Sequence, residues 1–137
     1  MDLEKTLYVS ASGLNAQSHR MRVIAENLAN ANSVARSPDQ DPYRRKVITF
    51  KNVLDRELGI NKVEVDRITR DRSEFGLSYQ PGHPAADRFG YVRTPNVKSL
   101  IEVNDMREAQ RSYEANLRVI EATKRMLRNT VELLRRQ

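Results

Sequence analysis

Hydrophobic residues recur every seven positions near the amino terminus, which is the spacing of a helix that presents one apolar seam to a neighbour. The line consists of Leu7, Leu14, Met21 and Leu28. A second apolar line, displaced by two residues and so about 200° round the helix, consists of Val9, Ala16 and Val23. One partner cannot cover both lines. We therefore predict a helix within residues 1–33 that is buried by other chains. The alternative is a helix sandwiched inside its own domain, but few residues elsewhere in the chain could build the second layer.

The carboxyl-terminal arm carries a longer repeat of the same kind. One line, again stepping by seven, consists of Met106, Tyr113, Ile120, Leu127 and Leu134. It interleaves with Val103, Gln110, Leu117, Lys124 and Val131. Alternating steps of three and four are typical of a coiled coil, and polar core positions such as Gln110 and Lys124 set its register or partner. The alternative is a long amphipathic helix packed on a globular body.

Between the two arms the pattern changes to the period of two that is typical of strands. All five Pro and four of the five Gly lie between residues 38 and 95. Strands are predicted at residues 44–50, 62–68 and 89–94, with a turn at Gly59 and an irregular segment at 70–88. The predicted fold is mainly α with a small β insert. A coiled-coil-like pair of long terminal helices (1–33 and 97–137) flanks a small antiparallel β domain (34–96) of about three strands.

The composition excludes several kinds of chemistry. The chain of 137 residues contains no Cys, so disulfides, thiolate nucleophiles and thiolate metal sites are excluded. Its two histidines, His19 and His83, do not occur in a metal-binding spacing. The paired carboxylates Asp39 and Asp41 lie in a proline-flanked linker without a desolvated pocket. We predict no catalytic, cofactor-binding or metal-binding residues and no enzymatic activity.

The formal net charge of +6 raises the question of nucleic acid, so a basic nucleic-acid-binding coiled-coil protein is one alternative. The longest basic cluster, residues 44–46, would alternate between the two faces of a strand, and acidic residues interrupt the basic ones along the last helix. We therefore expect no nucleic-acid partner. No apolar run approaches the ~20 residues that span a bilayer, and the amino terminus lacks the pattern of a cleaved secretory signal.

Three asparagines gather where the first helical seam ends, in the sequence IAENLANANS of residues 24–33. Asparagine closes helices because it tolerates the left-handed conformation and its amide bonds nearby backbone groups. Residues 12–33, SGLNAQSHRMRVIAENLANANS, resemble the amino-terminal signature of bacterial flagellar axial proteins, the rod and hook group. The motif residues of this resemblance include Gly13, Gln17, Arg20, Asn27 and Asn30, together with Leu14, Ile24, Ala25, Leu28 and Ala29.

Further stretches resemble the proximal rod subunits of the flagellar basal body within this group. They are residues 42–46, 79–84, 90–92, 95–97 and 111–116, with Glu102, Asp105 and Met106. The resemblance implies a structural protein of the helical rod, with terminal helices in the inner layer and an outer β domain, that transmits torque across the periplasm. A different rod subunit is the nearest alternative.

The resemblance also implies a set of partners and a location. We expect self-association in the helical rod, contacts with the other proximal and the distal rod subunits, and contact with the adaptor protein at the rod base. Export through the flagellar type III apparatus, without a cleaved signal peptide, would place the chain in the periplasmic rod. The predicted assembly seam consists of Leu7, Leu14, Met21, Leu28, Met106, Tyr113, Ile120 and Leu127.

Overall fold

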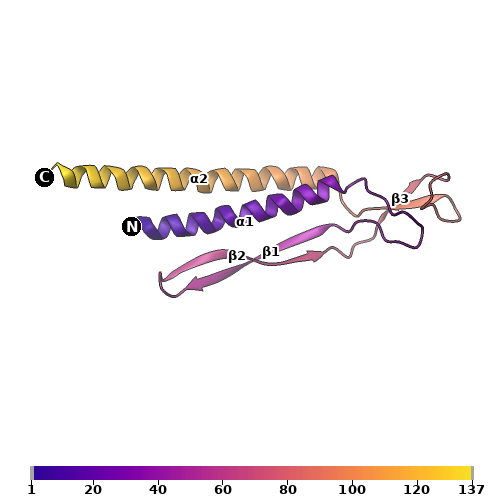
Figure 1. Ribbon diagram of the computed structural model, residues 1–137, viewed down its shortest axis with the longest axis horizontal. Helices are drawn as coiled ribbons and strands as arrows, with labels where there is room; N and C mark the ends of the chain where they lie inside the picture. The colour runs from indigo at the N-terminus through magenta and orange to yellow at the C-terminus, as the bar shows by residue number, and fades with distance from the viewer. Residues whose placement is uncertain (1, 137) are drawn as a thin grey trace. The chain divides into compact units, whose positions relative to one another are not determined.

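The computed structural model describes residues 2–136, and Figure 1 shows the elements that they form. In chain order these are α1 (Leu3–Ala29), β1 (Lys46–Asp55), β2 (Ile60–Arg70), β3 (Gly76–Tyr79), β4 (Tyr91–Thr94) and α2 (Ser99–Arg135). The two terminal helices pack together, and small two-stranded antiparallel sheets lie between them in the sequence. The predicted fold class is therefore confirmed.

Polar side chains that flank the two ends of α1 form hydrogen bonds with backbone groups of the helix. The carboxylate of Asp2 accepts a hydrogen bond of 3.2 Å from the backbone N–H of Lys5, which caps the amino-terminal end. At the other end, the side-chain amide of Asn30 donates to the carbonyl of Glu26 at 2.8 Å. The Asn30 carbonyl accepts from the backbone N–H of Ser33 at 3.1 Å. The helix stop predicted at the asparagine cluster is confirmed.

The strands differ from the prediction in number and grouping. β1 pairs with β2 across the turn at Gly59, whose φ of 64° lies in the left-handed region that favours glycine. The third predicted strand corresponds to β4, but it joins neither β1 nor β2. It pairs instead with β3, in a register that runs from Gly76 opposite Thr94 to Tyr79 opposite Tyr91. The prediction of one three-stranded sheet is therefore wrong.

The missed strand lies within residues 70–88, which were predicted to be irregular. β3 has only four residues, and its large apolar side chains, Leu77 and Tyr79, are 66% and 65% exposed. Such a short segment shows no useful period of its own. Its pairing depends on β4, where Val92 is completely buried and fixes which face of that strand points inward.

The chain forms two compact units, each with a small core. Unit 1 comprises Met1–Met21, Thr49–Arg67 and Arg107–Gln137, and unit 2 comprises Arg22–Ile48 and Ile68–Met106. The buried residues of unit 1 among those described are Ser10, Ala16, Ala109 and Thr123. The most buried large side chains of unit 2 are Glu102, Val92 and Asn27. Two of these three are polar, so the core of unit 2 depends on hydrogen bonding as well as on apolar packing.

Candidate assembly site

The predicted seam residues are only partly covered within the chain. Seven of the eight are half-buried, namely Leu7, Leu14, Met21, Leu28, Met106, Tyr113 and Ile120, and the eighth, Leu127, is 37% exposed. The most buried apolar side chains of α1 are instead Ala16, Val23 and Ile24, at 3–4% exposure. Two of these belong to the second apolar line. One side of α1 is therefore used inside the chain, and the line of Leu7 and its heptad partners keeps surface for another contact.

On α2 the most buried positions also step by seven residues. Glu102, Ala109 and Thr123 are almost fully buried, and Asn116, which completes the series, is half-buried. The predicted interleaving line that starts at Val103 does not form this buried face. Its other members are exposed, namely Gln110, Leu117, Lys124 and Val131. The face of α2 that packs inside the chain therefore consists of small and polar residues. The predicted seam did not include these residues because it was based on large apolar side chains.

In unit 1, two of the family-motif residues lie at the contact between α1 and α2, and a third is buried. Gly13 allows a close approach, because a Cβ atom there would lie 2.9 Å from the side-chain nitrogen of Asn116. Arg20 pairs with Glu108 at 3.4 Å. The side-chain oxygen of Gln17 is buried and has no hydrogen-bond partner among the residues that the structure describes. Gly13 and Arg20 therefore serve the packing of one helix on the other.

In unit 2, the motif residue Asn27 uses its whole side-chain amide to join three elements. Its nitrogen donates to the backbone carbonyl of Lys46 at 2.9 Å and to the carboxylate of Glu102 at 3.1 Å. Its oxygen accepts from the backbone N–H of Lys46 and from the hydroxyl of Tyr43, both at 2.9 Å. Burial raises the pKa of Tyr43, so this hydroxyl keeps its proton and remains a donor. The fifth motif residue, Asn30, forms hydrogen bonds at the end of its own helix.

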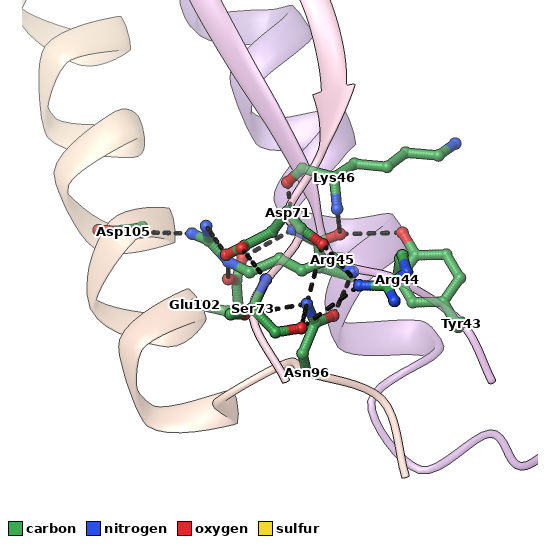
Figure 2. A network of polar contacts seen from close by, with 10 residues as sticks. Tyr43, Arg44, Arg45, Lys46, Asp71, Ser73, Asn96, Glu102 and Asp105 are labelled. Carbon is green, nitrogen blue, oxygen red and sulfur yellow. Dashed lines mark hydrogen bonds and ion pairs between the residues drawn. The ribbon is translucent and has the colours of Figure 1, made fainter. Parts of the chain in front are cut away.

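The buried carboxylate of Glu102 is the centre of the polar network in Figure 2. The guanidinium of Arg45 donates to one of its oxygens, and Asn27 donates to the other. Arg45 also lies 3.8 Å from the carboxylate of Asp71 and 3.7 Å from that of Asp105. A buried charge with both oxygens bonded to donors is tolerated in a core, whereas an unpaired one would be strongly destabilising.

Further hydrogen bonds of the network join the residue before β1 to the segments that follow β2 and β4. The side-chain oxygen of Asn96 accepts from the backbone N–H of Arg45 at 2.7 Å, and its nitrogen donates to the backbone carbonyl of Asp71 at 3.1 Å. The backbone N–H of Ser73 donates to the carboxylate of Asp71 at 2.8 Å, which lowers the pKa of that carboxyl. Arg44 donates to the carbonyl of Asp71 and stacks over the ring of Phe75.

This network positions backbone and side chains but offers no reactive constellation. In the described part of the chain, no group of three or more His, Asp or Glu residues could hold a metal ion. The described residues contain no helix with an apolar stretch of membrane-spanning length. The sequence places Asn27 in the motif, and Arg45, Asn96 and Glu102 in the further stretches of family resemblance. It does not predict that these residues bond one another, because they come from segments that are distant in the sequence.

The carboxyl-terminal part of α2 leaves several large apolar side chains of unit 1 uncovered. Every residue from 124 to 136 is exposed. The large apolar side chains among them, at 37–69% exposure, are Met126, Leu127, Val131, Leu133 and Leu134. Large apolar side chains that are exposed together on one helix segment are typical of an interaction site. This segment of α2 is therefore a candidate for contacts with other chains.

Comparisons with known proteins agree with this interpretation. Residues 7–36 match the family model described as flagella basal body rod protein, and residues 89–133 match that of the flagellar basal body rod FlgEFG protein C-terminal region. The chain is 49% identical to the flagellar basal-body rod protein FlgC of Agrobacterium fabrum strain C58, over 93% of this chain and 91% of the relative. It is 40% identical to the FlgC of Yersinia enterocolitica, over 97% and 98%, and 40% identical to that of Bacillus subtilis strain 168, over 93% and 95%.

Proposed function

The chain belongs to the FlgC family of flagellar basal-body rod proteins, and on this premise we propose that it builds the proximal rod by polymerising through its two terminal helices. A proximal rod subunit is a structural protein and not an enzyme, and its family assembles with other rod subunits. This assignment replaces the alternatives of a nucleic-acid-binding protein and of a different rod subunit. The proposal concerns how the helices bring about assembly.

The observation that carries the proposal is the uncovered apolar surface of the helices. Leu7, Leu14, Met21 and Leu28 remain half-exposed on α1, and α2 is exposed from residue 124 to residue 136. Burial of apolar surface contributes about 25 cal/mol per Å², so covering these lines with neighbouring subunits would drive association. The same burial would order helix turns that are only marginally stable alone, which couples folding to assembly.

We assign the inner layer of the rod to residues 1–33 and 97–137 and the outer layer to the β-rich residues 34–96. Closely packed helices deform little, which suits a shaft that transmits torque. Charged pairs between subunits, formed from the many Arg and Glu residues of α2, would set the register more than the affinity. By family resemblance we also propose the rod-base adaptor and the distal rod subunits as neighbours, and export by the flagellar type III apparatus into the periplasmic rod without a cleaved signal.

Charge substitutions in the seam test this proposal. Leu14→Asp on α1 and Ile120→Asp on α2 each place a carboxylate in a line that assembly must bury. We expect either variant to abolish rod formation and swimming, as measured by motility in soft agar and by electron microscopy of basal bodies. Asn15→Asp and Ala115→Asp are the matched controls, because each places the same aspartate at an exposed position of the same helix outside the seam, and both variants should swim.

Protein abundance separates a packing defect from loss of the chain. Immunoblots of the cell and of isolated basal bodies should find Leu14→Asp and Ile120→Asp in the cell but not in the rod. Normal swimming by either variant would show that the seam is assigned wrongly.

A further inference from the structure

A cleft lined by arginines lies in unit 2, beside the end of β2. It has a volume of about 760 Å³, and its lining residues are Arg44, Thr69, Arg70 and Arg72. All four belong to unit 2. Arg70 and Arg72 are exposed, and Arg44 is half-buried. We call this set of residues the arginine cleft. Three of its four lining side chains carry a charge that does not titrate in proteins.

No carboxylate of the described chain pairs with these three arginines. None of the ion pairs among residues 2–136 includes Arg44, Arg70 or Arg72. Arg44 donates instead to the backbone carbonyls of Asp71 and Ser73, at 3.2 and 3.3 Å (Figure 2). Its guanidinium also lies 4.2 Å from the centre of a phenylalanine ring. These contacts hold the side chain in place and leave its charge uncompensated.

The acidic residues of the same part of the chain do not line the arginine cleft. Asp71 follows β2 directly, but its carboxylate lies 3.8 Å from the guanidinium of Arg45 and lines a different cavity. Glu74 also lines another cavity. Glu26 pairs with Lys46 at 2.6 Å. The arginine cleft is therefore a local concentration of positive charge that attracts anionic groups.

The chemistry of the cleft fits carboxylates of another protein. A guanidinium group presents a planar fork of donors that binds a carboxylate or a phosphate through two hydrogen bonds. Nucleic acid is disfavoured by the charge pattern already described, in which acidic residues interrupt the basic ones along α2. The rod family assembles with other rod subunits, so proteins surround this chain in its assembly. The anionic groups that they offer are Asp and Glu side chains.

A second copy of this chain offers no suitable acidic segment. Acidic residues that lie within three positions of one another occur at several places, and in each such group at least one member pairs with a basic residue of the same chain. The paired members are Asp2, Asp41, Asp55, Asp66, Asp71, Glu102, Asp105 and Glu108. No described segment therefore presents two neighbouring carboxylates that are both without an ion-pair partner. The occupant must come from a different protein.

Building on the proposed function, we propose that the arginine cleft of unit 2 is the docking site for an acidic segment of a different rod protein. The carboxylates of that segment pair with Arg70 and Arg72, which are exposed, and with Arg44, which its backbone contacts hold ready. Charge pairs of this kind set the choice and orientation of a partner more than the affinity. The cleft thus selects a neighbour of this subunit, while the terminal helices supply the apolar burial.

Binding of a short fluorescent glutamate peptide to the purified chain tests the chemistry of the cleft. The double variant Arg70→Glu, Arg72→Glu should bind this peptide about tenfold more weakly, as measured by fluorescence anisotropy, because it reverses two exposed charges. The matched control is the double variant Arg125→Glu, Arg128→Glu, which changes the net charge equally at two exposed positions of α2. It should bind as the native chain does. Equal binding by the two variants, or no binding by the native chain, would overturn the proposal.

Urea unfolding checks that the loss of binding is local. Arg70 and Arg72 are exposed and form no ion pair, so the double variant should unfold at the native urea concentration. If its midpoint falls, the neutral pair Arg70→Gln, Arg72→Gln takes its place in the binding measurement. Weakened binding by that pair would support the cleft, and native binding would overturn it. A glutamine peptide of the same length should not bind the native chain.

Photo-crosslinking in intact basal bodies identifies the occupant itself. A benzophenone amino acid would replace Thr69, which is exposed and lines the cleft. Mass spectrometry should find it joined to a segment of a different protein that carries at least two neighbouring Asp or Glu residues. The same position in the Arg70→Glu, Arg72→Glu background is the control and should lose this adduct.

The outcomes distinguish this inference from the proposed function. An adduct with another copy of this chain, with a lipid or with nucleic acid would overturn the docking, and so would the lack of any adduct in rods that contain the variant chain. Polymerisation through the terminal helices would then still stand. Normal swimming of Leu14→Asp would instead overturn the proposed function and leave the peptide-binding result unchanged.

Discussion

The side-chain amide of Asn27 donates a hydrogen bond of 3.1 Å to the fully buried carboxylate of Glu102. This bond joins the last turns of α1 to the first turn of α2 across 75 residues of sequence. Because Asn27 also bonds both backbone groups of Lys46, one side chain fixes the two helices and the start of β1 together. The core of unit 2 is therefore sensitive to any change in its hydrogen-bonding pattern.

Asn27→Asp should destabilise unit 2 severely. The substitution replaces two donated hydrogen bonds with a carboxylate that faces the buried carboxylate of Glu102. Disrupting a buried charged network in this way costs about 3–5 kcal/mol. We expect the midpoint of urea unfolding of the purified chain to fall sharply, and the amide of Lys46 to exchange its hydrogen much faster.

Asn30→Asp is the matched control for this prediction. It makes the same chemical change three residues later, where the amide bonds only the carbonyl of Glu26, and should cost about 1 kcal/mol or less. An Asn27→Asp chain as stable as its Asn30→Asp counterpart would contradict the role given to the network.

Gly13 and Asn116 should be energetically coupled. Alanine at position 13 would favour the helix by about 1 kcal/mol, but its Cβ would lie 2.9–3.1 Å from three atoms of the Asn116 side chain. We expect Gly13→Ala alone to gain nothing in the free energy of unfolding. In the Asn116→Ala background the same substitution should stabilise the chain by about 1 kcal/mol. A thermal-unfolding double-mutant cycle measures this coupling, and strictly additive effects would show that the helices do not approach closely at this point.

The β1–β2 turn should lose order in acid. The carboxylate of Asp55 bonds Lys62 at 2.7 Å and the backbone N–H of Leu58 at 3.2 Å, and the bond to Lys62 is the largest cause of the lowered pKa of Asp55. A carboxyl whose pKa is lowered on folding contributes stability above its unfolded value, here 3.8, and this stability is lost as the pH falls through the folded value. Amide exchange at Glu57 and Leu58 should therefore be protected at neutral pH and lose this protection below pH 3.8.

Lys62, the partner of Asp55, should make the stability of the β1–β2 turn depend on alkaline pH as well. The pKa of Lys62 is raised above 10.5 by its bond to Asp55, so its contribution is complete below that value and is lost as the pH rises through the folded pKa. Asp55→Asn should remove both dependences. If the Asp55→Asn chain loses turn protection at the same acid pH as the native chain, another group is responsible.

The helices could be predicted from the sequence because their signals are local and repeated. The seven-residue lines predicted both terminal helices, and the asparagine cluster predicted the end of α1. The pairing of β3 with β4 could not be predicted, because four residues with exposed side chains contain too little pattern, and the partner strand lies beyond a turn-rich segment.

The site was predicted only in part, for a similar reason. Asn27 belongs to a recognisable motif, but its bonds to Glu102 and Lys46 depend on the tertiary fold. Glu102 is charged, and charged residues are almost never fully buried unless they are paired. Nothing adjacent to Glu102 in the sequence indicated that Arg45, 57 residues earlier, would be its partner.

We propose that assembly covers helix surfaces that the single chain leaves open, and hydrogen exchange at residues 124–136 can detect this cover. Amide exchange at residues 124–136 should be measured in the purified monomer and in intact basal bodies, with the Lys46 amide as an internal reference. We expect rapid exchange of residues 124–136 in the monomer and strong protection in the rod, while Lys46 is protected in both. Equal protection of residues 124–136 in the two states would show that assembly does not cover this segment.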